Sequence, residues 1–139
     1  MRQAQKEITV ATAGQGLYEI SAAARSFAEE AGIATGQLTA YCRHTSASLV
    51  IQENADPAVQ RDLVAFFRRL VPEGDPLFVH TIEGPDDMPA HVKSALTQTS
   101  ITIPIVRSML ALGTWQGLYL FEHRRARHQR KIVLHIIGS

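Results

Sequence analysis

Strand-forming segments are concentrated in the last third of the chain, and this concentration constrains the fold more than any other sequence feature. Residues 100–106, 115–121 and 132–137 are rich in aliphatic and aromatic side chains and have the length of strands. The last segment is nearly continuously apolar, which predicts a central, buried strand. Further strands are expected at 6–12, 17–20, 36–43, 48–51 and 77–79, with a weaker candidate at 110–112.

Helix signals lie earlier in the chain, outside this group of strands. Asp56 and Pro57 suit the N-cap and first position of a helix, and the apolar residues that follow repeat at helical spacing. A second helix is expected after Ser21 as N-cap, ending before Gly32, and a short third one at about 89–96. Because strands are grouped rather than alternating with helices, the pattern predicts an α+β fold. No linker or repeat interrupts residues 1–139, so we expect a single domain.

Composition restricts the classes of function. The chain carries 14 basic and 13 acidic side chains, a balance that argues against a nucleic-acid partner bound through broad phosphate neutralisation. The basic run at 124–131 is interpreted as a solvated turn. Cys42 is the only cysteine, so no internal disulfide can form, which is compatible with a reducing compartment. No segment approaches the roughly 20 apolar residues that cross a bilayer. We therefore expect a soluble, cytoplasmic protein with no membrane partner.

Six histidines are present, and three of them have settings that favour a functional site. His44 and His80 end predicted strands, and His91 begins a predicted helix. An acidic loop that includes Glu83 and Asp87 joins the last two, and imidazole suits zinc and similar divalent ions. The opposing interpretation, that each histidine is simply hydrogen-bonded, stays open for these three.

The other histidines are weaker candidates. The opposing interpretation is favoured for His128, in the basic turn, and His135, in the last apolar strand, and His123 is left undecided.

Two further segments suit a ligand. Hydroxyl groups beside His44 can hold an oxyanion, although a polar strand edge explains them equally well. The compact segment at 113–116, with the only tryptophan, can contact a ligand or a neighbouring subunit. The candidate substrate-binding residues are Thr45, Ser46, Ser48, Asn54, Gly113, Thr114, Trp115 and Gln116.

Long, ordered segments of the chain resemble the YjbQ family, also called the secondary thiamine-phosphate synthase family. They are HTSASLVIQENADP (44–57), EGPDDMPAHVKSAL (83–96), TSITIPI (99–105) and LALGTWQGLYLFEH (110–123). The resemblance implies an antiparallel β-sheet sandwich with a few helices, assembled as a homotrimer. It also implies a divalent metal, zinc first, held by His44, His80 and His91, with the acidic loop and the 113–116 turn completing the pocket.

Three functions follow from these residues and the resemblance. In the first, an enzyme uses the metal on a phosphorylated small molecule, with Glu83 or Asp87 as general base; thiamine-phosphate synthesis is the named version. In the second, a non-catalytic homotrimer binds a metal and a phosphorylated metabolite. In the third, the histidines coordinate across a subunit boundary and hold the oligomer together.

Overall fold

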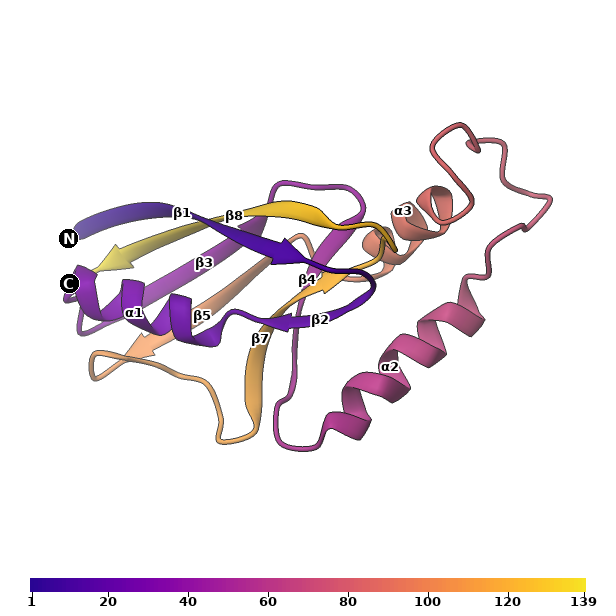
Figure 1. Ribbon diagram of the computed structural model, residues 1–139. Helices are drawn as coiled ribbons and strands as arrows, with labels where there is room; N and C mark the ends of the chain where they lie inside the picture. The colour runs from indigo at the N-terminus through magenta and orange to yellow at the C-terminus, as the bar shows by residue number, and fades with distance from the viewer.

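A computed structural model describes all 139 residues as two antiparallel sheets with three helices (Figure 1). The expected α+β sandwich is confirmed. In chain order the elements are β1 (Arg2–Thr12), β2 (Gly16–Glu19), α1 (Ser21–Ala31), β3 (Gly36–Cys42), β4 (Ala47–Glu53), α2 (Pro57–Leu70), α3 (Asp87–Leu96), β5 (Ser100–Val106), β6 (Met109–Leu110), β7 (Gln116–Glu122) and β8 (His128–Gly138).

The larger sheet has five strands in the order β1-β8-β3-β5-β6. The last strand, β8, lies between β1 and β3, so the expectation of a central strand is correct. Its side chains nevertheless alternate: Ile132, Leu134 and Ile136 are buried, while Val133 and His135 are only half-buried. The sheet therefore has one covered face, on which α1 and the smaller sheet build the core.

The smaller sheet has three strands in the order β2-β7-β4, and both faces of β7 are covered. Leu118 and Leu120 belong to the core between the sheets. On the opposite face the Tyr119 hydroxyl accepts a hydrogen bond from Gln60 of α2, and the ring of Phe121 lies 5.3 Å from that of Phe67. The side chains on this face, Tyr119 and Phe121, are followed in the same alternation by His123, just beyond the strand. The end of β7 therefore lies between the core and the helical side of the molecule.

Helix α2 begins as the sequence predicts. The Asp56 carboxylate accepts a hydrogen bond from the Ala58 amide at 2.9 Å, and Pro57 is the first helical residue. Although α2 is strongly amphipathic, none of its residues is fully buried, and Phe66 and Leu70 on its apolar face are about half exposed. The helix lies at one side of the smaller sheet (Figure 1), and these exposures show that part of its apolar face is uncovered.

Helix α1 differs from expectation at its start. Its N-cap is Ile20, whereas Ser21 is the first helical residue. The Ser21 hydroxyl donates to Glu19 and accepts from the Leu118 amide, because β2 pairs with β7 up to Glu19 and brings that amide close. The expected end is confirmed: Gly32 has the left-handed backbone conformation, with φ of 63°.

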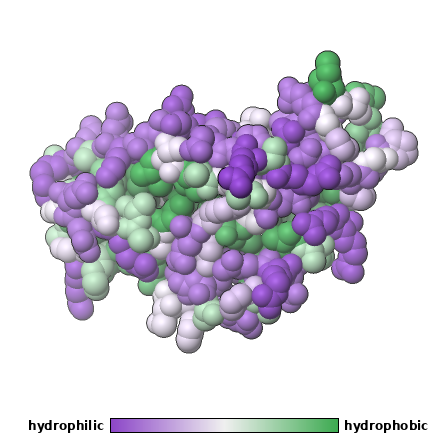
Figure 2. Space-filling view, in the orientation of Figure 1, coloured by the Kyte–Doolittle hydropathy of each residue, from purple (hydrophilic) through white to green (hydrophobic).

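The strand predicted at 77–79 is wrong. Residues 71–86 connect α2 to α3 without strand or helix, and their apolar side chains Leu77, Val79 and Ile82 are almost fully exposed. Figure 2 shows apolar side chains at the surface over this part of the molecule. No residue of this connection pairs with a strand of either sheet. No helix in the protein has the length and apolar character needed to cross a membrane.

Candidate metal centre

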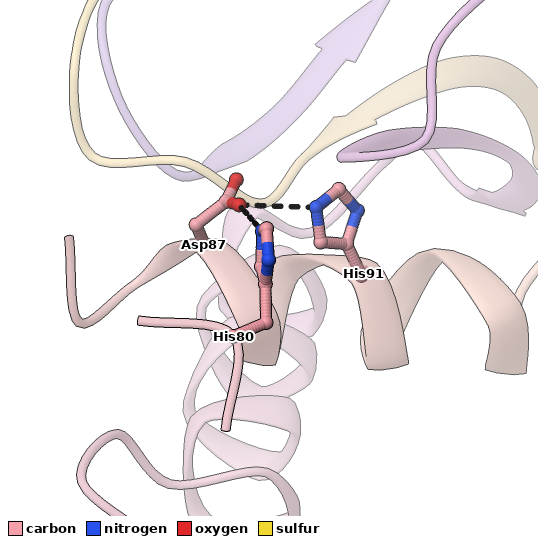
Figure 3. Close-up of side chains that lie close together, drawn as sticks. All are labelled: His80, Asp87 and His91. Carbon is pink, nitrogen blue, oxygen red and sulfur yellow. Dashed lines mark hydrogen bonds and ion pairs between the residues drawn. The ribbon is translucent and has the colours of Figure 1, made fainter. Parts of the chain in front are cut away.

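His80, Asp87 and His91 converge at the start of α3 (Figure 3). The Oδ2 atom of Asp87 lies 2.8 Å from Nε2 of His80 and 3.1 Å from Nε2 of His91. The three candidate ligand atoms, one from each side chain, all lie within 4.8 Å of one another. The structure therefore brings together two of the three predicted ligand histidines, around a carboxylate that the sequence suggested as a base.

Helix geometry and one loop explain this convergence. Asp87 and His91 are four residues apart on α3, a spacing that places them on the same face one turn apart. His80 comes from the connection between α2 and α3, which turns back over the start of that helix. The acidic loop between the two histidines is thus the turn that brings them face to face.

Arg124, just beyond β7, fixes the Asp87 carboxylate from the other side. Its Nη1 donates to Oδ1 of Asp87 at 2.8 Å, its Nε to Asp86 at 3.0 Å, and its Nη2 to the Glu83 carbonyl at 3.0 Å. Because Oδ1 is engaged by the guanidinium, Oδ2 is the oxygen left for the imidazoles. Burial raises the pKa of Asp87, but the hydrogen bond with His80 and the charge of Arg124 help to outweigh it, and that pKa lies below its usual range.

The hydrogen bonds of the His91 ring determine which charges this cluster requires. Its Nδ1 lies 2.8 Å from the Thr45 carbonyl oxygen, which only accepts, so Nδ1 must carry a proton. A neutral ring then has a bare lone pair on Nε2, which faces the carboxylate oxygen of Asp87. Two lone pairs at this distance repel, and either a second proton on the ring or a cation between the atoms relieves the repulsion. The arrangement thus calls for positive charge between His91 and Asp87.

The donor set fits zinc and similar ions. Bonds of 2.0–2.1 Å in a tetrahedral site place ligand atoms about 3.4 Å apart, close to the present separations from Oδ2. A metal-binding histidine typically donates its other ring N–H to a carbonyl, as His91 does to Thr45. The side chain of His80 remains 42% exposed, so solvent reaches one side of the cluster. Three protein ligands with an open side are typical of catalytic rather than structural zinc sites.

His44 does not join this cluster within one chain. Its Nε2 accepts a hydrogen bond from the Lys131 amide at 2.7 Å, and its Nδ1 lies 3.4 Å from Nη1 of Arg130. Burial and the charge of Arg130 lower the pKa of His44. The Nε2 atom is therefore committed to the backbone of β8, and Asp87 takes the third ligand position beside His80 and His91.

Two of the three hydroxyls near His44 are also engaged inside the protein. The Ser48 hydroxyl is fully buried and bonded to Nε2 of His123 at 2.9 Å and to the Thr97 hydroxyl at 2.6 Å. Ser46 accepts from the Arg130 guanidinium at 3.0 Å. Only the Thr45 side chain is exposed, and it lies next to the carbonyl bonded by His91. Ser46 and Ser48 thus act as internal bridges and cannot hold a ligand in this structure.

The 113–116 turn lies at the far end of β7 from the histidines. The pairing of β4 with β7 places Gln116 opposite Glu53 at one end and Glu122 opposite Ala47 at the other. Six residues of extended strand separate these ends by roughly 20 Å. Gly113 donates its amide N–H to Gln116, Trp115 is largely exposed, and Asn54 donates to the Trp115 carbonyl. Within one chain this turn does not complete the pocket at His80 and His91.

The expectation of a solvated basic turn is wrong for two arginines of the 124–131 run. Arg124 is bonded to Asp86 and Asp87, and Arg130 is buried against Glu122. The adjacent acidic pair at 86–87 was a usable signal for Arg124, because two neighbouring carboxylates become buried only with a compensating cation. For Arg130 the signal was its place in the alternation of β8, in register with the buried Ile132 and Leu134.

A family model described as UPF0047 protein YjbQ-like matches residues 6–139. The chain belongs to this YjbQ-like family. It is 50% identical over 138 residues to a UPF0047 protein of Synechocystis sp., covering 99% of this chain and 94% of the relative. It is 36% identical over 136 residues to the UPF0047 protein YjbQ of Escherichia coli, covering 97% and 98%.

Solved structures of YjbQ-like proteins share the fold. A YjbQ/UPF0047-family protein of Clostridium acetobutylicum superposes with a TM-score of 0.87 at 32% identity, covering 95% of this chain and 99% of the other. A similar protein of Sulfolobus solfataricus reaches a TM-score of 0.91 at 23% identity and covers 99% of each chain. The two-sheet architecture is thus common to bacterial and archaeal proteins whose sequences differ widely.

Proposed function

We propose that the protein binds a divalent metal ion, zinc first, through Nε2 of His80, Oδ2 of Asp87 and Nε2 of His91. The observation that carries the proposal is the doubly engaged His91 ring, which donates from Nδ1 to Thr45 and turns Nε2 toward a carboxylate. A cation shared by the three atoms satisfies all of them at once. Asp87 is then a ligand, and its role as a general base is set aside.

The metal site is proposed to act on a phosphorylated small molecule in the cytoplasm. A bound zinc ion supplies Lewis acidity and lowers the pKa of water. Arg124 holds Asp87 in place, and Thr45 orients His91 through its carbonyl. The side chain of Glu83 is exposed in the loop bonded by Arg124, and it remains the candidate base. Thiamine-phosphate synthesis, the reaction that the family resemblance implies, is the first to test.

Metal content tests the first step. Untagged protein is loaded with zinc, dialysed, and analysed by plasma mass spectrometry beside His91→Ala and His135→Ala. His135 is a matched control, because it bonds only Gln3 on the open face of the larger sheet. We expect one zinc per chain in the parent and in H135A and none in H91A. Zinc retained by folded H91A, or absent from the parent, would overturn the metal site.

Turnover separates the enzyme from the non-catalytic binder. The zinc-loaded protein is supplied with an aminopyrimidine diphosphate and a thiazole phosphate, and thiamine phosphate is measured by chromatography. The enzyme hypothesis predicts product that disappears in H91A and persists in H135A. The binder alternative predicts ligand-dependent thermal stabilisation without product. Equal turnover in H91A would contradict a metal-dependent reaction.

A homotrimer is the proposed assembly. Phe66 and Leu70 on α2 and Leu77, Val79 and Ile82 of the following connection are all exposed. Exposed apolar surface of this kind is typical of an interface when it is contiguous. Light scattering after size exclusion is expected to give three times the 15.3 kDa chain mass. Dissociation on adding EDTA would favour histidines that coordinate across subunits, whereas a trimer that persists would favour an apolar interface.

A further inference from the structure

A charged recess lies on the helical side of the β7–β8 turn, separate from the metal cluster. It has a volume of about 570 Å³ and is lined by Gly14, Gln15, Arg68, Glu73 and Arg125 together with two apolar residues. This volume is within the range of small-molecule sites. The recess is formed by the end of α2, the β1–β2 turn and the β7–β8 turn, none of which contributes a proposed metal ligand.

The backbone around Arg125 links the recess to the metal cluster. The Arg125 amide donates to Asp86 at 2.9 Å, while its side chain reaches Glu73 at 3.1 Å. The preceding Arg124 points its guanidinium to Asp87. The two neighbouring arginines of this turn thus belong to different sites: Arg124 bonds Asp87 of the metal cluster, and Arg125 lines the recess.

Lys93 is a buried cation on α3, outside the lining of the recess. It lies on the covered side of α3 with only 5% of its surface exposed. Its ammonium takes part in none of the chain's hydrogen bonds or ion pairs, and it keeps a small contact with solvent, because every fully enclosed side-chain nitrogen has a partner. Burial lowers the pKa of Lys93 most, the charge of Arg68 lowers it further, and Glu73 and Asp86 raise it. Of these charged groups, Arg68 and Glu73 line the recess, whereas Asp86 is bonded to Arg124.

Donors in the recess outnumber acceptors. Its lining carries two positive charges, those of Arg68 and Arg125, against the single carboxylate of Glu73. Arg68 uses Nε and one Nη to bond a single oxygen of Gln15, at 3.4 and 3.0 Å, and its remaining Nη is free. The recess lining thus has an unused donor and a net charge of +1.

We infer that this recess binds the phosphate group of a small molecule through Arg68 and Arg125. Guanidinium groups match phosphate oxygens with paired N–H donors. Gly14 allows the β1–β2 turn to lie close to the β7–β8 turn beside the recess: its φ of 122° suits glycine, and a Cβ there would meet the Arg125 carbonyl at 3.3 Å. The assignment rests on the proposed function in one respect, namely that the ligand carries a phosphate.

Phosphate titration with matched arginine variants tests this inference. Inorganic phosphate and phenyl phosphate are titrated into the full-length protein by calorimetry at constant ionic strength. Arg68→Gln is compared with Arg69→Gln, its exposed neighbour on α2, and Arg125→Gln with Arg127→Gln in the same turn. We expect saturable binding that weakens at least about tenfold in R68Q and R125Q and is unchanged in R69Q and R127Q. Equal loss in both members of a pair, or no saturable binding to the parent, would overturn the site.

His91→Ala separates this inference from the metal proposal. We expect H91A to lose zinc and keep phosphate binding, and R68Q to lose phosphate binding and keep zinc; circular dichroism verifies that both variants fold. If H91A loses both zinc and phosphate, the anion sits on the metal and the recess is not its site. If H91A retains zinc but R68Q loses phosphate, the metal proposal fails while the recess stands.

Discussion

Two carboxylates near the end of β7 are almost fully buried and each meets an arginine, yet their surroundings differ. Glu122 faces the interior between the sheets, and its oxygens accept from Thr12, from Arg130, and from the amides of His123 and Arg124. Asp87 is held by Arg124 on one oxygen only. Its other oxygen faces the rings of His80 and His91, one of which is 42% exposed.

The two sites differ in closure, meaning whether every hydrogen-bonding group in the network has a suitable partner. Around Glu122 every acceptor has a donor, and the pKa of Glu122 is lowered because hydrogen bonds and the charge of Arg130 outweigh the effect of burial. Around Asp87 one imidazole nitrogen has the wrong partner unless positive charge is added. A closed network stabilises a fold, whereas an open one of this kind is suited to a ligand. Variants in the two clusters should therefore affect different measurements.

Replacing Glu122 with Gln should have the largest effect on stability. The variant keeps the shape of the side chain but leaves the Arg130 guanidinium, only 5% exposed, without a counter-charge. Breaking a buried ion pair by removing one partner costs about 3–5 kcal/mol. Urea unfolding at fixed protein concentration measures this loss, and zinc bound per folded chain should not change. A loss below about 1 kcal/mol would mean that the network is not closed as described.

Replacing His80 with Ala should give the opposite pattern. His80 is partly exposed and comes from a connection without regular structure, so the free energy of unfolding of the metal-free protein should change by less than about 1 kcal/mol. Zinc affinity should fall more than about 100-fold, since loss of a mere outer partner already costs 10–100-fold. Competition with a chromophoric chelator measures the affinity, with His128→Ala as the control. A stability loss as large as that of E122Q would show that the cluster is structural.

His123 lies between the two regions and makes stability depend on pH. Burial, with the nearby charges of Lys93 and Arg130 against that of Glu122, lowers the pKa of His123 to about 3. Between pH 6.5 and 3 the unfolded chain binds a proton that the folded ring cannot, so stability falls as pH falls through this range. From pH 8 to pH 5 the loss from this group is about 2 kcal/mol.

Comparison with His123→Gln isolates this contribution. The glutamine variant keeps a polar group beside Ser48 and should lose about 2 kcal/mol less than the parent between pH 8 and pH 5. His135→Gln should retain the full dependence of the parent. Urea unfolding at both pH values measures the differences, and identical slopes in the parent and H123Q would exclude the buried neutral ring.

Local patterns in the sequence predicted most of the elements, because those patterns act over a few residues. The alternation at 100–106 and the capping pair Asp56–Pro57 both correspond to observed elements. Residues 77–79 have the composition of a strand, but they lie in an exposed connection and pair with no strand. Composition shows that a segment can pair, whereas the presence of a partner depends on the whole topology.

The site was predicted in its components but not in its pairings. His80, His91 and Asp87 were all identified, two as ligands and one as a base, and the structure brings them together. The placement of His44 against Lys131, and of the 113–116 turn at the far end of β7, depends on strand register. Register is set by pairing between distant segments, and no spacing within either segment reveals it.

The exposed pair of Arg43 and Glu7 provides the smallest expected effect and tests whether closure, rather than charge, separates the two clusters. Its atoms are 2.7 Å apart, much like the contacts around Glu122, but the side chains are 56% and 40% exposed. Water screens such a pair, so Glu7→Gln should cost less than about 1 kcal/mol by the same urea measurement. E7Q therefore removes the same charge as E122Q at a similar separation and differs chiefly in burial. If both variants lose the same free energy, the stability of the Glu122 network comes from ion pairing alone and the contrast with the open cluster is lost.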